Sequence, residues 1–376
     1  MDRRTVDIYE RSAAEYGDRR RAYAADRAEA FASRLPAGGV RLDLGAGPGH
    51  YLPHLGSPVV AADPAPSMVA EARRRHPGTP GVVCDAAALP VRAGALAGVW
   101  ASKCLQHLPR VELPGALTGL HRAIALGGVL DLTVFQGDGA ARTDGDDDFP
   151  GRHFTWWQPG PLADLLVGAG FTIDGPDDGV EVEASTDPFA RLTARATRAR
   201  TLPDTVGPGM RLLVCGLNPS LYAADAGVGF ARPGNRFWPA ALAAGLVTTD
   251  RSPERALRDH GVGMTDLVKR ATVAASELVA DEYRDGLARV ERLVAWLRPG
   301  AVCFVGLAGW RAAVDRRATA GVQAAALAGV PVYVMPSTSG LNARVLVSEH
   351  ADHLRAAARL ADATIAARPT PVPRRG

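Results

Sequence analysis

The polar residues that follow one apolar run are the first candidates for chemistry in this chain. Between Pro208 and Trp238, the apolar run Leu212–Cys215 gives way to Gly216-Leu217-Asn218-Pro219 and then to a glycine-rich loop that carries Phe230. The run predicts a buried strand, and the polar residues after it predict a loop that is delivered to a pocket.

A second glycine-rich turn lies in the sequence Val40-Arg41-Leu42-Asp43-Leu44-Gly45-Ala46-Gly47-Pro48-Gly49. Glycines there let the backbone approach a ligand and leave the N–H groups of a following helix pointing at an anionic group. The next apolar run ends on Asp63, where a carboxylate suits the two hydroxyls of a ribose. One such turn with one aspartate is a weak signal by itself.

Alternating apolar runs and amphipathic segments predict an α/β chain. Strands at 40–44, 59–62 and 82–84, the last ending on Asp85, alternate with a helix at 67–75, which indicates a parallel, doubly wound sheet. A helix at 158–169 precedes two alternating segments, 180–184 and 189–197, which we expect to close this sheet as an antiparallel pair.

The first 34 residues predict one or two helices. Tyr9, Tyr16 and Tyr23 recur there every seven residues, so they either cover the edge of a pocket or pack in the core. The acidic stretch 143–148 predicts a solvated loop.

We expect a first domain at 1–200, a linker at 201–209, a second domain at 210–365 and a disordered tail at 366–376. The linker and tail are predicted from Pro, Gly and polar residues without periodicity. In the second domain, strands at 301–307 and 330–335 join the run after Pro208, and helices are expected at 281–297 and 348–364. This order predicts a three-layer α/β/α sandwich.

Composition narrows the class of protein. At 376 residues the chain is too long for one compact core. The net charge is +3, but from Thr205 onward 21 Lys and Arg face 14 Asp and Glu, so the second half is the one to suspect of binding a polyanion, a basic solvated surface being the alternative. The charged start and the lack of a long apolar run predict a soluble cytoplasmic protein without a membrane partner.

Four widely spaced cysteines, Cys84, Cys104, Cys215 and Cys303, lie in or beside apolar runs. Because no CxxC or Cys/His cluster accompanies them, we expect buried free thiols rather than a zinc site, another metal or an iron-sulfur cluster.

The ordered motifs LDLGAGPG, AADPAPSM, CDAAALP, QHL and ALGGVLDLTVF, over about residues 5–200, resemble the class I S-adenosylmethionine-dependent methyltransferases that act on small molecules. The resemblance implies S-adenosylmethionine as cofactor. It assigns Gly45, Gly47 and Gly49, beside Asp43, to the methionine portion, Asp63 to the ribose and Asp85 to the adenine. The chain lacks the N/D-P-P-aromatic and Pro-Cys motifs of DNA methyltransferases, and the small-molecule acceptor is not identified.

His107 is a candidate general base because an unperturbed imidazole titrates near neutrality. We favour a structural histidine, since position in the chain says nothing about distance to a substrate.

The motifs GLNPS, GVGFARPGNRFW, GVGMTDLV and MPSTSGLN, over about residues 208–360, resemble the mismatch-specific uracil/thymine DNA glycosylases of the uracil-DNA glycosylase superfamily. The resemblance implies a base excision repair enzyme, without a cofactor, that acts on double-stranded DNA. It would flip a uracil or thymine mispaired with guanine and cleave its glycosidic bond by water attack at the sugar. Such a protein would be associated with the nucleoid when it acts on DNA.

The resemblance implies that Asn218 orients the attacking water. The alternative interpretation is that Asn218 only forms a turn before Pro219. A carboxamide cannot take up a proton as a carboxylate can, so we expect slow turnover. Phe230 would stack on the flipped pyrimidine, or else it is a core residue.

The resemblance also implies a base-binding set and a wedge that enters the duplex. The base-binding residues are Leu217, Ala223, Phe230 and Ser337, and the wedge is Ser339, Gly340, Leu341 and Asn342. Arg344 is displaced by one position from the family arginine.

Four more residues are expected to affect the size of the base pocket or the conformation of the glycine-rich loop. Ala223 should leave room for the methyl group of thymine. Ser220, in place of the usual glycine, adds bulk near the pocket. Asn235 and Arg236 more simply fix the loop through hydrogen bonds.

Three functions stay open at this point. The leading one is a bifunctional chain, a methyltransferase joined to a mismatch-specific glycosylase. The others are a non-catalytic mismatch-binding module and a small-molecule methyltransferase with an inactive glycosylase appendage.

Overall fold

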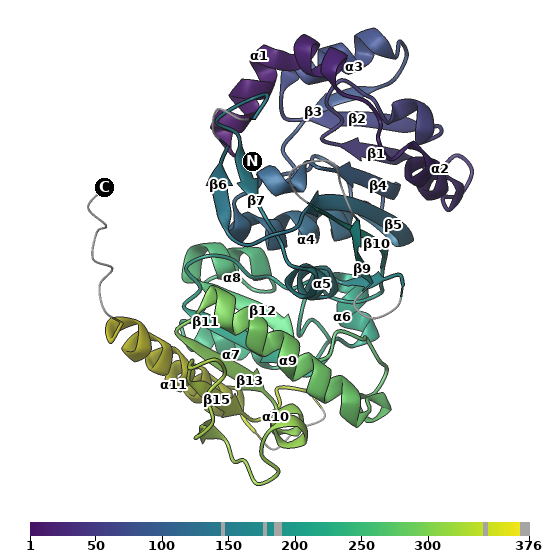
Figure 1. Ribbon diagram of the computed structural model, residues 1–376. Helices are drawn as coiled ribbons and strands as arrows, with labels where there is room; N and C mark the ends of the chain where they lie inside the picture. Colours follow the sequence, from purple (N-terminus) through teal and green to yellow (C-terminus); the bar gives the residue numbers. More distant parts are fainter. Residues whose placement is uncertain (144–146, 176–178, 184–189, 341–344, 369–376) are drawn as a thin grey trace. The chain divides into compact units, whose positions relative to one another are not determined.

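The computed structural model describes residues 1–143, 147–175, 179–183, 190–340 and 345–368. The chain divides into two compact units, Met1–Ala199 and Arg200–Gly376. Each unit is an α/β structure with its own sheet (Figure 1).

The sheet of the first unit has the order β3-β2-β1-β4-β5-β10-β8. Its parallel strands are β1 (Arg41–Leu44), β2 (Val59–Asp63), β3 (Gly81–Val83), β4 (Leu96–Ser102) and β5 (Ile124–Phe135). The antiparallel part consists of β8 (Phe171–Ile173), β9 (Val180–Glu183) and β10 (Arg191–Arg198). The predicted doubly wound sheet, closed by an antiparallel pair, is confirmed.

Helices pack on this sheet. They are α1 (Arg3–Arg19), α2 (Ala25–Ser33), α3 (Pro66–Arg75), α4 (Leu113–Ala123) and α5 (Pro159–Gly168), and a small hairpin is formed by β6 (Ala140–Arg142) and β7 (His153–Thr155). The glycine turn after β1 leads into a single 3-10 turn, Leu52–His54, and not into the expected helix. Gly49 and Gly56 bound this segment with φ of +85° and +71°, a conformation that ends helices.

The second unit has a five-stranded sheet in the order β12-β11-β13-β15-β14. Its parallel strands are β11 (Leu212–Gly216), β12 (Val262–Asp266), β13 (Ala301–Val305) and β15 (Val332–Met335). The short β14 (Gly321–Val322) is antiparallel to β15.

Alternate residues of β11 show the layers of this unit. Leu212 and Val214 pack in a buried cluster with residues of α7 (Phe237–Ala243), α8 (Pro253–His260) and α11 (Val347–Ala366). Leu213 and Cys215 pack on the opposite face with α9 (Ala280–Leu297) and α10 (Leu307–Ala313). The predicted three-layer sandwich is confirmed, although α6 (Leu221–Ala226), α7, α8 and α10 were not predicted.

The segment expected to be a linker is packed against the second sheet instead. Thr205 forms a β-bridge with Met264, and Leu202 and Val206 are buried. Asp204 accepts hydrogen bonds from Lys269 Nζ (2.8 Å) and Arg289 Nη1 (2.7 Å). The lack of periodicity in this segment correctly indicated an irregular backbone. The segment is nevertheless fixed to the second unit, because the buried Asp204 carboxylate binds Lys269 and Arg289.

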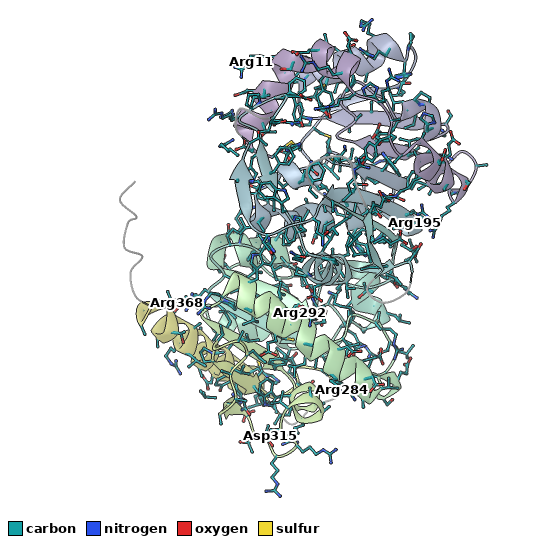
Figure 2. The ribbon with its side chains drawn as sticks, viewed as in Figure 1. Arg11, Arg195, Arg284, Arg292, Asp315 and Arg368 are labelled. Atoms are coloured by element: carbon teal, nitrogen blue, oxygen red, sulfur yellow. The ribbon has the colours of Figure 1, made fainter. Side chains whose placement is uncertain are left out.

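The exposed residues of the second unit include the arginines Arg284 and Arg292 of α9 and Arg368 after α11, which are labelled in Figure 2. All four cysteines are buried and free, as predicted. Within the described ranges, no helix has the length and apolar character to cross a membrane, and no group of three His, Cys, Asp or Glu side chains is placed to hold a metal ion.

Candidate active sites

Parallel strands of the second unit bring several polar residues to one edge of its sheet. Asn218 follows the end of β11, Asp266 ends β12, and Ser337 follows the end of β15. Phe230 reaches the same edge, because its Cζ lies 3.5 Å from the position that a Cβ on Gly216 would take. The carboxyl edge of a parallel sheet is where open α/β folds place their ligands.

The amide of Asn218 is held at one end. Its Nδ2 donates to Thr272 Oγ1 (2.8 Å), to the Arg270 carbonyl (3.0 Å) and to the Pro219 carbonyl (3.2 Å). Carbonyl oxygens only accept, so these contacts fix which end of the amide is the NH₂ group. No residue of the described ranges donates to Oδ1, which leaves this oxygen available to accept from a water molecule.

Phe230 is held in an uncommon backbone conformation. Its φ of +59° lies in the left-handed region, which costs a non-glycine residue about 1–2 kcal/mol. Its ring stacks on Phe237 with centroids 4.2 Å apart and planes 22° apart. Phe237 is fully buried while Phe230 is half-buried, so the core supports one face of the Phe230 ring.

The residues around α6 have structural partners. Ser220 caps the helix, because its hydroxyl accepts from the Ala223 N–H at 3.2 Å. Ala223 is buried. The Leu217 side chain packs toward Gly309, with Cδ1 3.0 Å from the position of a Cβ there, and against the buried cluster under α9 and α10.

The loop after β15 is tied to the loop before α7. Arg236 donates its backbone N–H to the Thr338 carbonyl (2.9 Å), and Asn235 Oδ1 accepts from the Phe237 N–H (2.9 Å). Asn235 and Arg236 therefore fix the loops, as we favoured. Ser337 Oγ accepts from the Ser339 N–H at 3.3 Å.

The predicted wedge is described only in part. Gly340 is exposed, and a Cβ on it would lie 3.0 Å from the Gly234 carbonyl oxygen, so the loop passes close to the Phe230 loop. Leu341, Asn342 and Arg344 lie outside the described residues.

Two residues of this site were missed in the sequence. Thr272 anchors the Asn218 amide, and nothing in its spacing indicated this. Asp266 ends a strand as Asp63 does, so the same signal was present in GVGMTD. Burial raises the pKa of Asp266 to about 6, with Lys269 opposing the shift.

In the first unit, Gly45, Gly47 and Gly49 have φ of +68°, +53° and +85°. A Cβ on Gly45 would collide with the Cβ of Cys104, whereas one on Gly47 would meet nothing closer than 3.9 Å. Gly45 is required by packing, and Gly47 leaves open space at the turn.

The carboxylate of Asp63 braces this turn. Its Oδ2 accepts from the Gly47 N–H (3.0 Å) and its Oδ1 accepts from the Ala65 N–H (2.9 Å). Burial raises the pKa of Asp63 to about 6 and that of Asp43 to about 8, the nearby Asp63 adding to the second shift. Asp43 is buried, and its Oδ2 has no hydrogen-bond partner in the described ranges.

A cavity opens beside the turn. Its lining includes Gly45, Gly47, Asp63, Tyr9, Tyr16 and Tyr23. The three tyrosines therefore line a cavity, and Tyr9 and Tyr16 also pack against a buried cluster, so both interpretations of their spacing apply. Asp43, Gly49 and Asp85 are not among the lining residues, and Asp85 instead accepts a hydrogen bond from the Met1 amino group at 2.5 Å.

His107 also lines this cavity, but both of its ring nitrogens are engaged. Nδ1 donates to the His153 carbonyl (2.7 Å), so Nε2 accepts from the Tyr9 hydroxyl (2.9 Å). Burial lowers the pKa of His107 to about 4. The ring is neutral at pH 7 and positions Tyr9, which supports the structural interpretation.

Asp147, expected in a solvated loop, is instead ion-paired with the buried Arg152. Arg152 also donates to the Tyr9 hydroxyl at 2.8 Å. Asp147 thus supports Tyr9, which lines the cavity, through Arg152, because a buried guanidinium requires a carboxylate partner.

Comparison with protein families assigns both units. Residues 203–359 match the family described as the uracil DNA glycosylase superfamily, and residues 42–128 match a methyltransferase domain family. The chain therefore carries a uracil DNA glycosylase superfamily domain after an N-terminal methyltransferase domain.

Solved structures similar to this chain include a SAM-dependent methyltransferase from Methanosarcina mazei, at 18% identity, 48% of this chain, 99% of that chain and a TM-score of 0.41. A complex of DhpI with SAH has 25% identity over 52% of this chain and 95% of that chain, with a TM-score of 0.40. A TehB-like SAM-dependent methyltransferase from Corynebacterium glutamicum has 17% identity over 52% of this chain and 100% of that chain, with a TM-score of 0.39.

Proposed function

We propose that the C-terminal domain, a member of the uracil DNA glycosylase superfamily, excises uracil mispaired with guanine from double-stranded DNA, and thymine more slowly. The observation that carries the proposal is the Asn218 amide, whose NH₂ end has three protein acceptors while its Oδ1 is open. An oxygen held in this way orients a water molecule toward the sugar carbon of a flipped nucleotide.

Phe230 supports the same proposed reaction. Its ring is braced by Phe237, so it offers a rigid surface on which a flipped pyrimidine stacks. Backbone N–H groups near Leu217 would bond the base carbonyls, and Ser337 would bond the base edge. The wedge Ser339–Asn342 would fill the gap left in the duplex, with Leu341 as its apolar tip.

The buried Ala223 is the basis for expecting thymine as a second substrate. A methyl side chain leaves more room for the 5-methyl group than a larger one, while thymine is the poorer leaving group. Incubation of a G·T duplex with excess protein, followed by alkali cleavage, tests this point. An uncut strand would reject it.

A mismatch-binding module without catalysis is the competing function for this domain. A binding module and a glycosylase would both bind a G·U duplex, but only a glycosylase leaves an alkali-labile abasic site. Gel-shift and cleavage assays on one duplex therefore separate them, and binding without cleavage over long incubation would favour the module.

We also propose S-adenosylmethionine as the cofactor of the methyltransferase domain, with a small molecule of unknown identity as acceptor. The residues fit this group, since Gly47 leaves space beside the cavity and Asp63, at the end of β2, lines the cavity. When bound, the cofactor supplies the methyl group, while Asp63 holds the ribose and Tyr9, Tyr16 and Tyr23 shield the cavity. Calorimetric titration should show binding by the wild type and not by Asp63→Ala.

A further inference from the structure

One carboxylate at the glycosylase site has no role in the mechanism above. Asp266 ends β12 directly beside Gly216 of β11. A Cβ on Gly216 would collide with Asp266 Oδ1 and would lie 3.5 Å from Phe230 Cζ. The carboxylate and the stacking ring thus both lie against Gly216, and the close approach of Asp266 Oδ1 requires a residue without a side chain at that position.

No hydrogen bond to either Asp266 carboxylate oxygen is found in the described part of the chain. The nearest cations are already paired, because Lys269 and Arg289 bind Asp204 at 2.8 and 2.7 Å. Arg289 contacts only the Asp266 backbone, donating to its carbonyl at 2.8 Å. The remaining titratable neighbour is the buried thiol of Cys215, whose pKa is raised by burial.

These surroundings disfavour the ionised carboxylate. Desolvation raises the pKa of Asp266 to about 6; Lys269 and Arg289 oppose the shift, and Asp204 adds to it. A half-buried carboxyl group without a hydrogen-bond partner in the described residues, at the carboxyl edge of the sheet beside Phe230, is suited to bind a ligand rather than to stabilise the fold.

The charge on the departing base determines which protonation state of Asp266 would favour the reaction. Negative charge develops on its ring and carbonyl oxygens as the glycosidic bond breaks, so an ionised carboxylate beside it would repel the leaving group. A protonated carboxyl group donates through its O–H and accepts through its C=O, which matches the adjacent carbonyl and N–H of uracil or thymine.

We propose that Asp266, in its protonated form, binds this imide edge of the flipped base and donates a hydrogen bond to the carbonyl oxygen on which charge develops. The inference rests on the proposed glycosylase function. The C1′–N1 bond breaks with its electron pair going to the base, the water held by Asn218 forms the C1′–O bond, and the proton lost by that water neutralises the base. Asp266 keeps its own proton.

The test is the single-turnover rate of excision from a G·U duplex by the full chain between pH 5 and 8.5. We expect the wild-type rate to fall as the pH rises through about 6, approaching tenfold per unit as the protonated fraction declines. Asp266→Asn donates a hydrogen bond at every pH, so its profile should be flat and its rate at pH 8 about tenfold or more above wild type. Asp352→Asn, an exposed carboxylate on α11, is the matched control and should keep the wild-type profile.

A wild-type rate that is flat or rises through this range overturns the role of Asp266, whatever the variant does. An Asp266→Asn protein that folds, by its melting temperature, but keeps the pH dependence or is slower at every pH also overturns it. A wild type that cuts no duplex at any pH removes the proposed glycosylase function, and this inference falls with it.

Discussion

The Asn218 amide depends on a threonine hydroxyl for its orientation. Thr272→Val keeps the shape of the side chain and removes the 2.8 Å contact to Nδ2. We expect the excision rate to fall about three- to tenfold, the value of one hydrogen bond, with unchanged affinity for DNA. Thr272→Ser should restore the rate because it keeps the hydroxyl. An equal loss in the serine variant would indicate a packing role instead.

Phe230 combines backbone strain with a functional surface. Phe230→Gly relieves the strain of a φ of +59° but loses the contact with Phe237, so the two effects oppose each other in the free energy of unfolding. We expect excision to fall about tenfold or more, because stacking contributes about 1–3 kcal/mol per base.

Phe230→Tyr is the matched control, since it keeps the stacking face. Chemical denaturation and single-turnover kinetics measure the two effects separately. A glycine variant with wild-type excision would show that the ring is only a core residue.

At the scale of elements, apolar runs predicted strands β1, β2, β3, β11, β13 and β15 closely, but no strand was predicted at β5, β12 or β14. β11, β13 and β15 are buried on both faces, so each reads as a continuous apolar segment. Helices α6, α7, α8 and α10 are shorter than nine residues, and segments of that length carry too little periodicity to be recognised.

Residues of the candidate sites could be predicted from the sequence only where they belong to a motif that resembles a known family. Asn218 and Phe230 came from a resemblance, and the structure brings both to one sheet edge. Thr272 and Asp204 act through contacts between segments 54 and more residues apart, which no local pattern reports.

Strand β1 carries a buried carboxylate with a measurable effect on stability. Because the folded pKa of Asp43 is raised from 3.8 to about 8, the folded state binds more protons than the unfolded state between these values. Stability of the methyltransferase domain should therefore fall as the pH rises from about 4 to 8. Asp43→Asn should raise its melting temperature at pH 8 and reduce the dependence on pH. Calorimetry at pH 5 and 8 would contradict this if both proteins lose stability equally.

At the scale of the whole molecule, each unit has its own sheet and its own buried clusters. Among the described residues, the contacts that build each site come from its own unit, so we expect saturating S-adenosylmethionine to leave the excision rate of the full chain unchanged. A change beyond experimental error would instead support coupling between base removal and methyl transfer.

The central claim is that Asn218 makes the second unit a mismatch-specific glycosylase. The most direct measurement is excision from G·U, G·T, A·U and single-stranded uracil substrates by the wild type and Asn218→Ala. We predict that the wild type cuts G·U, cuts G·T more slowly and cuts little of the others, and that Asn218→Ala abolishes cutting while binding to the G·U duplex persists. Equal cutting by the variant, or no cutting of G·U by the wild type, would contradict it.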